Sequence, residues 1–147
     1  MRNKLSTRIS WLITVASVWI IFEFEAGDIR LIIHWPAILF ISIYIYGLSL
    51  VTFGLSKTLS SVVGLKYLFI EKENSALELS KVYKCQINFS IVAAIIYIFI
   101  VIIGLLANSD IDSSKVVVPN IAYSILGLSF SVLISGLIYY PLCKKLS

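Results

Sequence analysis

The chain has 147 residues, of which 59% are hydrophobic and only 14% are charged. A soluble domain carries roughly a quarter charged residues, so this chain has too little polar surface to cover a core in water. Its net charge of +4 lies in the gaps between apolar runs, which favours membrane-topology signals and excludes a nucleic-acid-binding face. Composition therefore predicts an integral membrane protein in contact with membrane lipid.

The first apolar run covers residues 9–22 and follows a basic start. A basic start before a short apolar run is also typical of a cleaved secretory signal. The residues at 24–26 (Phe-Glu-Ala) do not form the small-x-small pattern of a cleavage site. We therefore favour a retained span at about 9–26, with Glu23 near its outer end.

Three longer runs, at 31–56, 85–109 and 116–143, contain no Asp, Glu, Lys or Arg. Each exceeds the roughly 20 apolar residues that cross a hydrocarbon core as a helix. A bilayer offers no water to backbone groups, so helix is the expected form. The predicted fold class is all-α: a polytopic membrane protein with four transmembrane helices in a single domain, residues 1–147. The predicted spans are about 9–26, 34–56, 86–107 and 117–141, with a cytoplasmic connection at about 57–85.

Ten of the twelve basic residues flank these spans on one side, and the other side holds Arg30, Lys115 and most of the acids. The ten are Arg2, Lys4, Arg8, Lys57, Lys66, Lys72, Lys81, Lys84, Lys144 and Lys145. Basic loops stay in the cytoplasm, so both termini are predicted inside, in a multi-pass protein of the inner (cytoplasmic) membrane.

The connection between the second and third spans is too short for a catalytic domain. Its Ser75-Ala-Leu-Glu78 is a capping box, which predicts the start of a helix that runs into the third span. The apolar stretch from Val62 to Ile70 either lies on the membrane surface or continues the second span.

No catalytic or metal-binding set is recognisable along the chain, so we expect neither enzyme activity nor a cofactor. His34 is the only histidine. Cys85 and Cys143 lack the close spacing of a zinc or redox site, and beside cytoplasmic lysines they are expected to be reduced thiols. Glu23 is either an interfacial residue or a proton-accessible group near the outer surface.

Small or polar side chains recur every three or four residues in the fourth predicted span, so they share one helix face. They are Asn120, Ser124, Gly127, Ser131 and Ser135. Two interpretations are open: the stripe allows close helix packing, or it lines a hydrated pore. In the second span, Gly47 and Gly54 are seven apart and predict another helix contact.

Three stretches together resemble the MotA family of flagellar stator proteins, relatives of the TolQ and ExbB proton-channel subunits. The first is Glu25-Ala-Gly-Asp-Ile-Arg-Leu-Ile-Ile-His-Trp-Pro36-Ala-Ile-Leu, similar to the family's short outer loop and Pro-opened second span. The second, Ser90-Ile-Val-Ala-Ala94, is similar to the start of its third span. The third comprises Ile121-Ala122, Gly127, Leu133 and Pro141-Leu-Cys-Lys-Lys-Leu146, similar to its fourth span and exit into the cytoplasm.

The resemblance implies a homo-oligomeric ring around a single-span MotB-like or ExbD-like partner, coupling proton or sodium flow to mechanical work. In this family the partner supplies the proton-carrying aspartate, and the stripe of the fourth span would face it. The resemblance further implies that Ser124 and Ser131 line the path, that Gly127 allows close approach and that Pro141 shapes the inner exit.

The chain also departs from the family. The large cytoplasmic domain is missing, Ile87 falls near the family's proline at the start of the third span, and Leu128 falls near its pore threonine. These departures favour the alternative: a non-conducting structural or regulatory four-helix membrane protein.

Overall fold

The computed structural model describes residues 9, 11–20, 34–70, 77–107 and 113–147, and the side chains of all of these except 113–120. Every regular element in these ranges is helical, as the sequence predicted. Among the described residues, three helices are long and apolar enough to cross a membrane, and a shorter apolar helix covers Trp11–Ile20. This composition of helices points to a membrane protein and is consistent with contact to membrane lipid.

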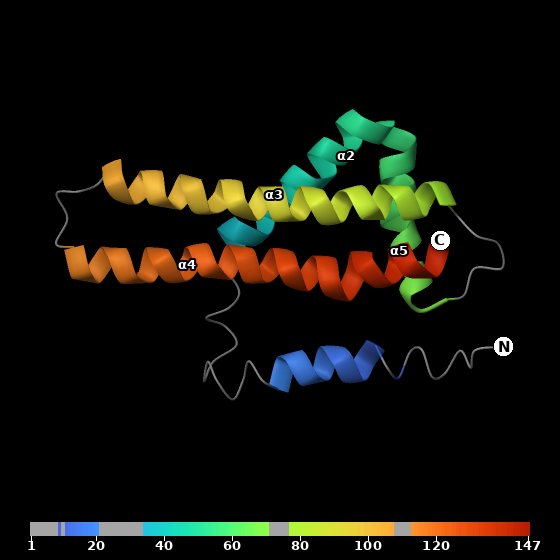
Figure 1. The fold of residues 1–147 in the computed structure, drawn as a ribbon, viewed down its shortest axis with the longest axis horizontal. Helices are drawn as coiled ribbons and strands as arrows, with labels where there is room; N and C mark the ends of the chain where they lie inside the picture. The colour runs from blue at the N-terminus through green and yellow to red at the C-terminus, as the bar shows by residue number, and fades with distance from the viewer. Residues whose placement is uncertain (1–8, 10, 21–33, 71–76, 108–112) are drawn as a thin grey trace.

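Two long antiparallel helices, α3 and α4, lie side by side and form the body of the molecule (Figure 1). Helix α3 covers Leu77–Ala107, and α4 covers Ser113–Ile134. The chain then passes through a π-helical turn, η3 (Ser135–Tyr139), directly into α5 (Tyr140–Leu146). The 31 residues of α3 extend about 46 Å at about 1.5 Å per residue. A hydrocarbon core is about 30 Å thick, so α3 is longer than is needed to cross it. The predicted span at 86–107 covers only part of this helix.

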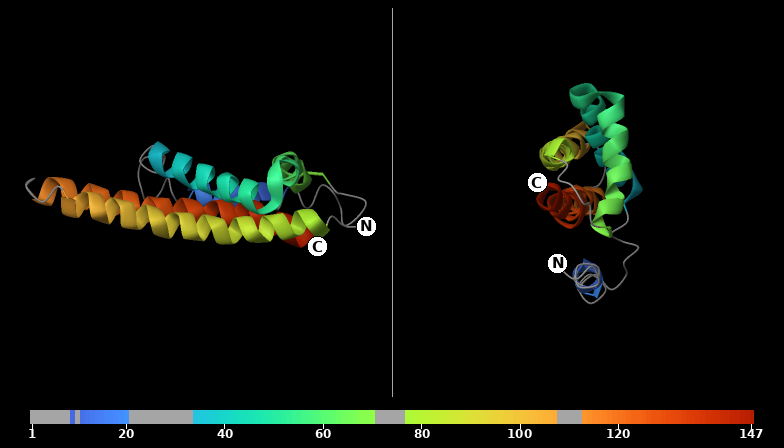
Figure 2. Two further views of the ribbon diagram at one scale, coloured as in Figure 1. Left: turned by 90° about the horizontal axis from the view of Figure 1, so that it is seen from above. Right: turned by 90° about the vertical axis from the view of Figure 1, so that its right-hand side faces the viewer.

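Helix α2 covers Trp35–Gly64 and is broken at Gly54, whose backbone has φ 77° and ψ 170°. This conformation is essentially confined to glycine, because a Cβ would clash with the backbone. The half before Gly54 packs along α3. The half after it, continued by η2 (Leu65–Leu68), turns across the ends of α3 and α5 (Figure 2).

Gly47 and Gly54 make no close helix contact within the described part of the chain. A Cβ built at either position meets nothing within 4 Å. Gly54 instead supplies the backbone conformation that redirects α2. Residues 62–68 are helical and belong to the segment that follows this break, so the choice between a surface segment and a continued span stays a prediction.

The connection predicted at about 57–85 is largely helical. Its first part is the crosswise half of α2, and α3 begins at Leu77 with Glu78 in its first turn. Ser75 of the predicted capping box lies outside the described residues. The described part of α3 runs into the predicted third span, and the capping box and the limits of the membrane spans stay predictions.

Candidate functional site

A buried amide, Gln86, lies at the contact between α2 and α3. Its side chain is fully buried, and Nε2 donates hydrogen bonds to Ser49 Oγ at 3.2 Å and to Ser61 Oγ at 3.1 Å. Ser49 precedes the break at Gly54 and Ser61 follows it. One amide group of α3 therefore ties together the two halves of α2, on either side of the break.

The orientation of this amide follows from the hydrogen bonds of the two serines. Ser49 Oγ donates to Ile45 O at 2.7 Å, and Ser61 Oγ donates to Thr58 O at 2.7 Å. Each hydroxyl has a single hydrogen, so both can only accept from Gln86, and the amide nitrogen must face them. Gln86 Oε1 then points elsewhere and has no hydrogen-bond partner among the described atoms.

Further polar contacts follow the same face of α3 toward its start. Tyr83 is fully buried and its hydroxyl donates to Ser61 O at 2.7 Å. One turn earlier, Ser80 Oγ donates to Cys143 O of α5 at 2.8 Å. These side chains bond α3 to both of its neighbours. In a membrane such hydrogen bonds contribute about 0.6 kcal/mol each on average. The stability that this network adds therefore depends on how many hydrogen bonds it contains.

The α4 stripe predicted from the sequence lies against α3 within a single chain. Ser124, Gly127, Ser131 and Ser135 are all buried. Ser135 shares a hydrogen bond with Ser90 of α3, whereas Ser131 Oγ has no partner in the part of the chain that the structure describes. The stripe faces a neighbouring helix, and Ser131 and Ser135 are covered by it.

Gly127 lies where an aromatic ring crosses the α4 backbone. A Cβ at this position would come within 2.6 Å of Tyr97 Cδ1, so no larger residue fits without displacing the ring. The Tyr97 hydroxyl shares a hydrogen bond with His34 Nδ1 at 3.1 Å. His34 also stacks on Tyr123, with ring centroids 4.3 Å apart. Close approach at Gly127 thus lets one tyrosine connect α3, α4 and the start of α2.

Leu128 is 43% exposed and borders a groove of about 270 Å³ between α3 and α4. The other lining residues come from both helices: Ile98, Ile102, Leu105, Ile121, Ser124 and Ile125. Ser124 supplies the only hydroxyl among these lining residues. Two predicted site residues therefore meet at one apolar groove, while Ser131 and Ser135 lie apart from it.

Pro141 does not end its helix, which continues to Leu146. Proline has no N–H to donate to the carbonyl four residues earlier, here that of Leu137, and its ring crowds that carbonyl. The π-helical turn at Ser135–Tyr139 widens the helix at this point. Trp11 Nε1 donates to Leu137 O at 2.9 Å, so the indole of the first helix occupies a carbonyl that Pro141 leaves free.

Trp11 also contacts Phe69, the residue that follows η2 at the end of the segment after Gly54. Its ring meets that of Phe69 edge to face, with centroids 5.0 Å apart. The helix Trp11–Ile20 runs beside α4 in Figure 1. Trp11 thus contacts two other parts of the bundle, at Leu137 and at Phe69.

Two predicted residues fall beyond what the structure describes. Glu23 lies outside the described residues, and Asn120 is in α4 but its side chain is not described. Cys85 and Cys143 are both free thiols. Within the described ranges, no group of three or more His, Cys, Asp or Glu side chains is placed to hold a metal ion.

The sequence reasoning missed Gln86, the residue with the most informative contacts. A signal for it exists: Ser80, Tyr83, Gln86 and Ser90 recur at intervals of three, three and four residues, the same pattern that identified the α4 stripe. Ser90 of this α3 pattern meets the stripe at Ser135, whereas Gln86 faces the serines of α2.

No protein-family model, curated protein or solved structure matches this chain. A functional assignment therefore depends on the site itself.

Proposed function

We propose that this chain is a MotA/TolQ/ExbB-like subunit of an oligomeric membrane complex, with four spans and both termini in the cytoplasm. It packs against a single-span partner that supplies the ion-carrying carboxylate, and the complex couples proton or sodium flow to mechanical work. The observation that carries this proposal is the apolar groove between α3 and α4, bordered by Ser124 and Leu128.

The orientation in this proposal is supported by where lysines gather. Lys57 Nζ of the crosswise segment pairs with Glu78 at the start of α3, 3.3 Å away, and Lys145 Nζ of α5 donates to Tyr67 O at 2.8 Å. These contacts bring three lysine-bearing segments to one end of the bundle. Basic residues are retained on the cytoplasmic side, so this end is assigned to the cytoplasm.

The groove suits a partner helix for two reasons. Its walls are aliphatic except at Ser124, and membrane helices associate by close packing beside small residues. The three long runs of this chain also contain no acidic residue, so a carboxylate at membrane depth in this part of the complex comes from another chain.

The test is co-purification with a candidate single-span protein that carries an aspartate in its membrane helix. We expect a defined stoichiometry above one copy of this chain, and ion flux when the complex is placed in liposomes. Leu128→Trp fills the groove and should abolish partner binding. Val132→Trp, one turn further on α4, exposed and outside the groove lining, is the matched control. A stable monomer that binds no such partner contradicts the proposal.

A second candidate is a non-conducting structural or regulatory membrane protein. The burial of Ser131 and Ser135 under α3 favours it, because covered hydroxyls do not line an open path. Replacing Ser124 and Ser131 together by alanine discriminates the two candidates. Flux that falls supports the conducting subunit, and a parent complex that conducts nothing supports the second candidate.

A further inference from the structure

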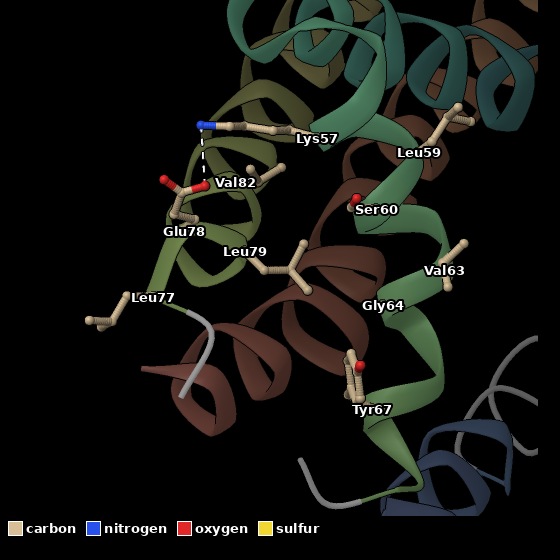
Figure 3. A pocket seen from close by; sticks show the side chains of 10 residues that line it. All are labelled: Lys57, Leu59, Ser60, Val63, Gly64, Tyr67, Leu77, Glu78, Leu79 and Val82. Atoms are coloured by element: carbon tan, nitrogen blue, oxygen red, sulfur yellow. Dashed lines mark ion pairs between the residues drawn. The ribbon is translucent and has the colours of Figure 1, made fainter. Parts of the chain in front are cut away.

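A second groove lies where the crosswise half of α2 passes over the start of α3. Its volume is about 740 Å³, within the range of roughly 300–1,000 Å³ typical of ligand pockets. Figure 3 shows the hollow between the two helices, with the Lys57–Glu78 ion pair at one end and Tyr67 at the other. This groove is separate from the one between α3 and α4, and the proposed function makes no use of it.

The walls of this groove are mainly apolar. Leu59 and Val63 come from the crosswise segment, and Leu77, Leu79 and Val82 from α3. Leu59, Val63 and Leu77 are each more than half exposed. Aliphatic side chains left open at the end of membrane helices stabilise contact with hydrocarbon, so an acyl chain is a suitable occupant.

The charges at the end of the groove are opposite in sign and accessible. Lys57 Nζ lies 3.3 Å from Glu78 Oε2, and the two side chains are 52% and 79% exposed. An exposed ion pair of this kind adds little stability of its own. Lys57 and Glu78 can therefore each pair with a charged group of a ligand instead, at a small cost in free energy. The lysine matches a phosphate and the carboxylate matches an ammonium group that donates hydrogen bonds.

We propose that this groove binds a phospholipid with a primary-ammonium headgroup, of the phosphatidylethanolamine class. The acyl chain lies along Leu59, Val63 and Leu79, the phosphate accepts from Lys57 and the ammonium donates to Glu78. A choline headgroup has no N–H to donate to the carboxylate, and an anionic glycerol headgroup leaves Glu78 facing like charge. The charge pair thus selects one class of lipid from the surrounding bilayer.

The experiment is native mass spectrometry of the purified full-length chain in mild detergent, titrated with phosphatidylethanolamine, phosphatidylcholine or phosphatidylglycerol of identical acyl chains. We expect one phosphatidylethanolamine adduct, retained about fivefold better than either other lipid, the preference that an exposed ion pair of up to about 1 kcal/mol provides. Equal retention of all three lipids, or none of any, overturns the proposal.

Three variants test the groove itself. Lys57→Ala should reduce the adduct by about fivefold, and Glu78→Gln should reduce phosphatidylethanolamine to the level of phosphatidylcholine without weakening phosphatidylglycerol. Ser60→Trp fills the groove without changing charge and should remove the adduct. Lys144→Ala, an exposed lysine of α5 away from the groove lining, is the matched control.

Helix content by circular dichroism shows whether each variant folds. Because Ser60→Trp and the two charge variants act through different properties, a fold defect in one leaves the others as tests. The proposal is overturned if all three folded variants retain phosphatidylethanolamine as well as Lys144→Ala does. It is also overturned if Lys144→Ala loses the lipid adduct to the same extent as they do.

Discussion

The two halves of the α3 surface hold their neighbours in different ways. Toward its start, α3 bonds α2 through Gln86 and Tyr83, with hydrogen bonds of 2.7–3.2 Å to Ser49 and Ser61. Toward its end, α3 holds α4 by the close approach of Tyr97 to Gly127. Close packing at a glycine occurs in both regions, because a Cβ at Gly64 of α2 would also collide with Tyr83 of α3. The buried amide that bonds both sides of the break at Gly54 distinguishes the contact of α3 with α2.

The difference follows from what each neighbour leaves unsatisfied. A helix without a break satisfies its own backbone hydrogen-bonding groups. Complementary packing is then sufficient to hold its neighbour, and small residues allow that packing. A broken helix has two segments whose relative direction is not set by backbone hydrogen bonds. A buried amide with two donors can bond one group in each segment and thereby set that direction.

The largest expected effect comes from filling the close contact. Gly127→Ala places a methyl group against the Tyr97 ring and should lower the free energy of unfolding by about 1–3 kcal/mol, the usual cost of overpacking. Unfolding in mixed micelles with increasing denaturing detergent measures this. Gly47→Ala, where a Cβ meets nothing within 4 Å, is the control and should be neutral or stabilising by up to about 1 kcal/mol. Equal losses in the two variants contradict a specific contact at Gly127.

The second effect comes from removing the polar tie. Gln86→Leu loses two side-chain hydrogen bonds, which at about 0.6 kcal/mol each corresponds to about 1 kcal/mol. We expect faster hydrogen exchange in the segment after Gly54, because its direction is no longer held. Asn88→Leu, an exposed amide on the same helix, is the matched control. Exchange that is unchanged in Gln86→Leu would show that other contacts hold the segment.

The smallest effects separate two serines of the α4 stripe. Ser135→Ala loses its hydrogen bond to Ser90 and should cost about 0.6 kcal/mol. Ser131→Ala removes a buried oxygen that has no partner in the described part of the chain, so it should be neutral or slightly stabilising. Detergent unfolding of the two single variants gives the comparison. A clear loss in Ser131→Ala would indicate that this hydroxyl has a partner in the assembled complex.

Much of the fold was predictable from the pattern of charges. The long uncharged runs predicted the three long helical segments of the described ranges. The small-residue spacing of α4 identified a face that is buried. It did not identify the element opposite that face, because a hydroxyl stripe is equally suited to a neighbouring helix of the same chain or to a pore.

Other features depend on pairs of distant residues, and a pattern along one helix does not show which residues those partners are. The backbone role of Gly54 was not predicted, because a glycine in an apolar run is equally suited to packing or to a backbone conformation closed to other residues. Gln86 was overlooked because its importance depends on Ser49 and Ser61, 37 and 25 positions away. The accommodation of Pro141 within a continuing helix, by a π-helical turn and by Trp11 from another helix, also depends on residues far apart in the chain.

By itself the sequence determined that this protein is helical and apolar, and which of its segments are long enough to cross a bilayer. This follows because backbone groups in hydrocarbon must bond within their own segment, so segment length and charge are sufficient information. Only the tertiary structure decided that α2 turns at Gly54, that the α4 stripe faces α3 and that two apolar grooves remain open. Those outcomes depend on which side chains meet across helices, and no local pattern contains that information.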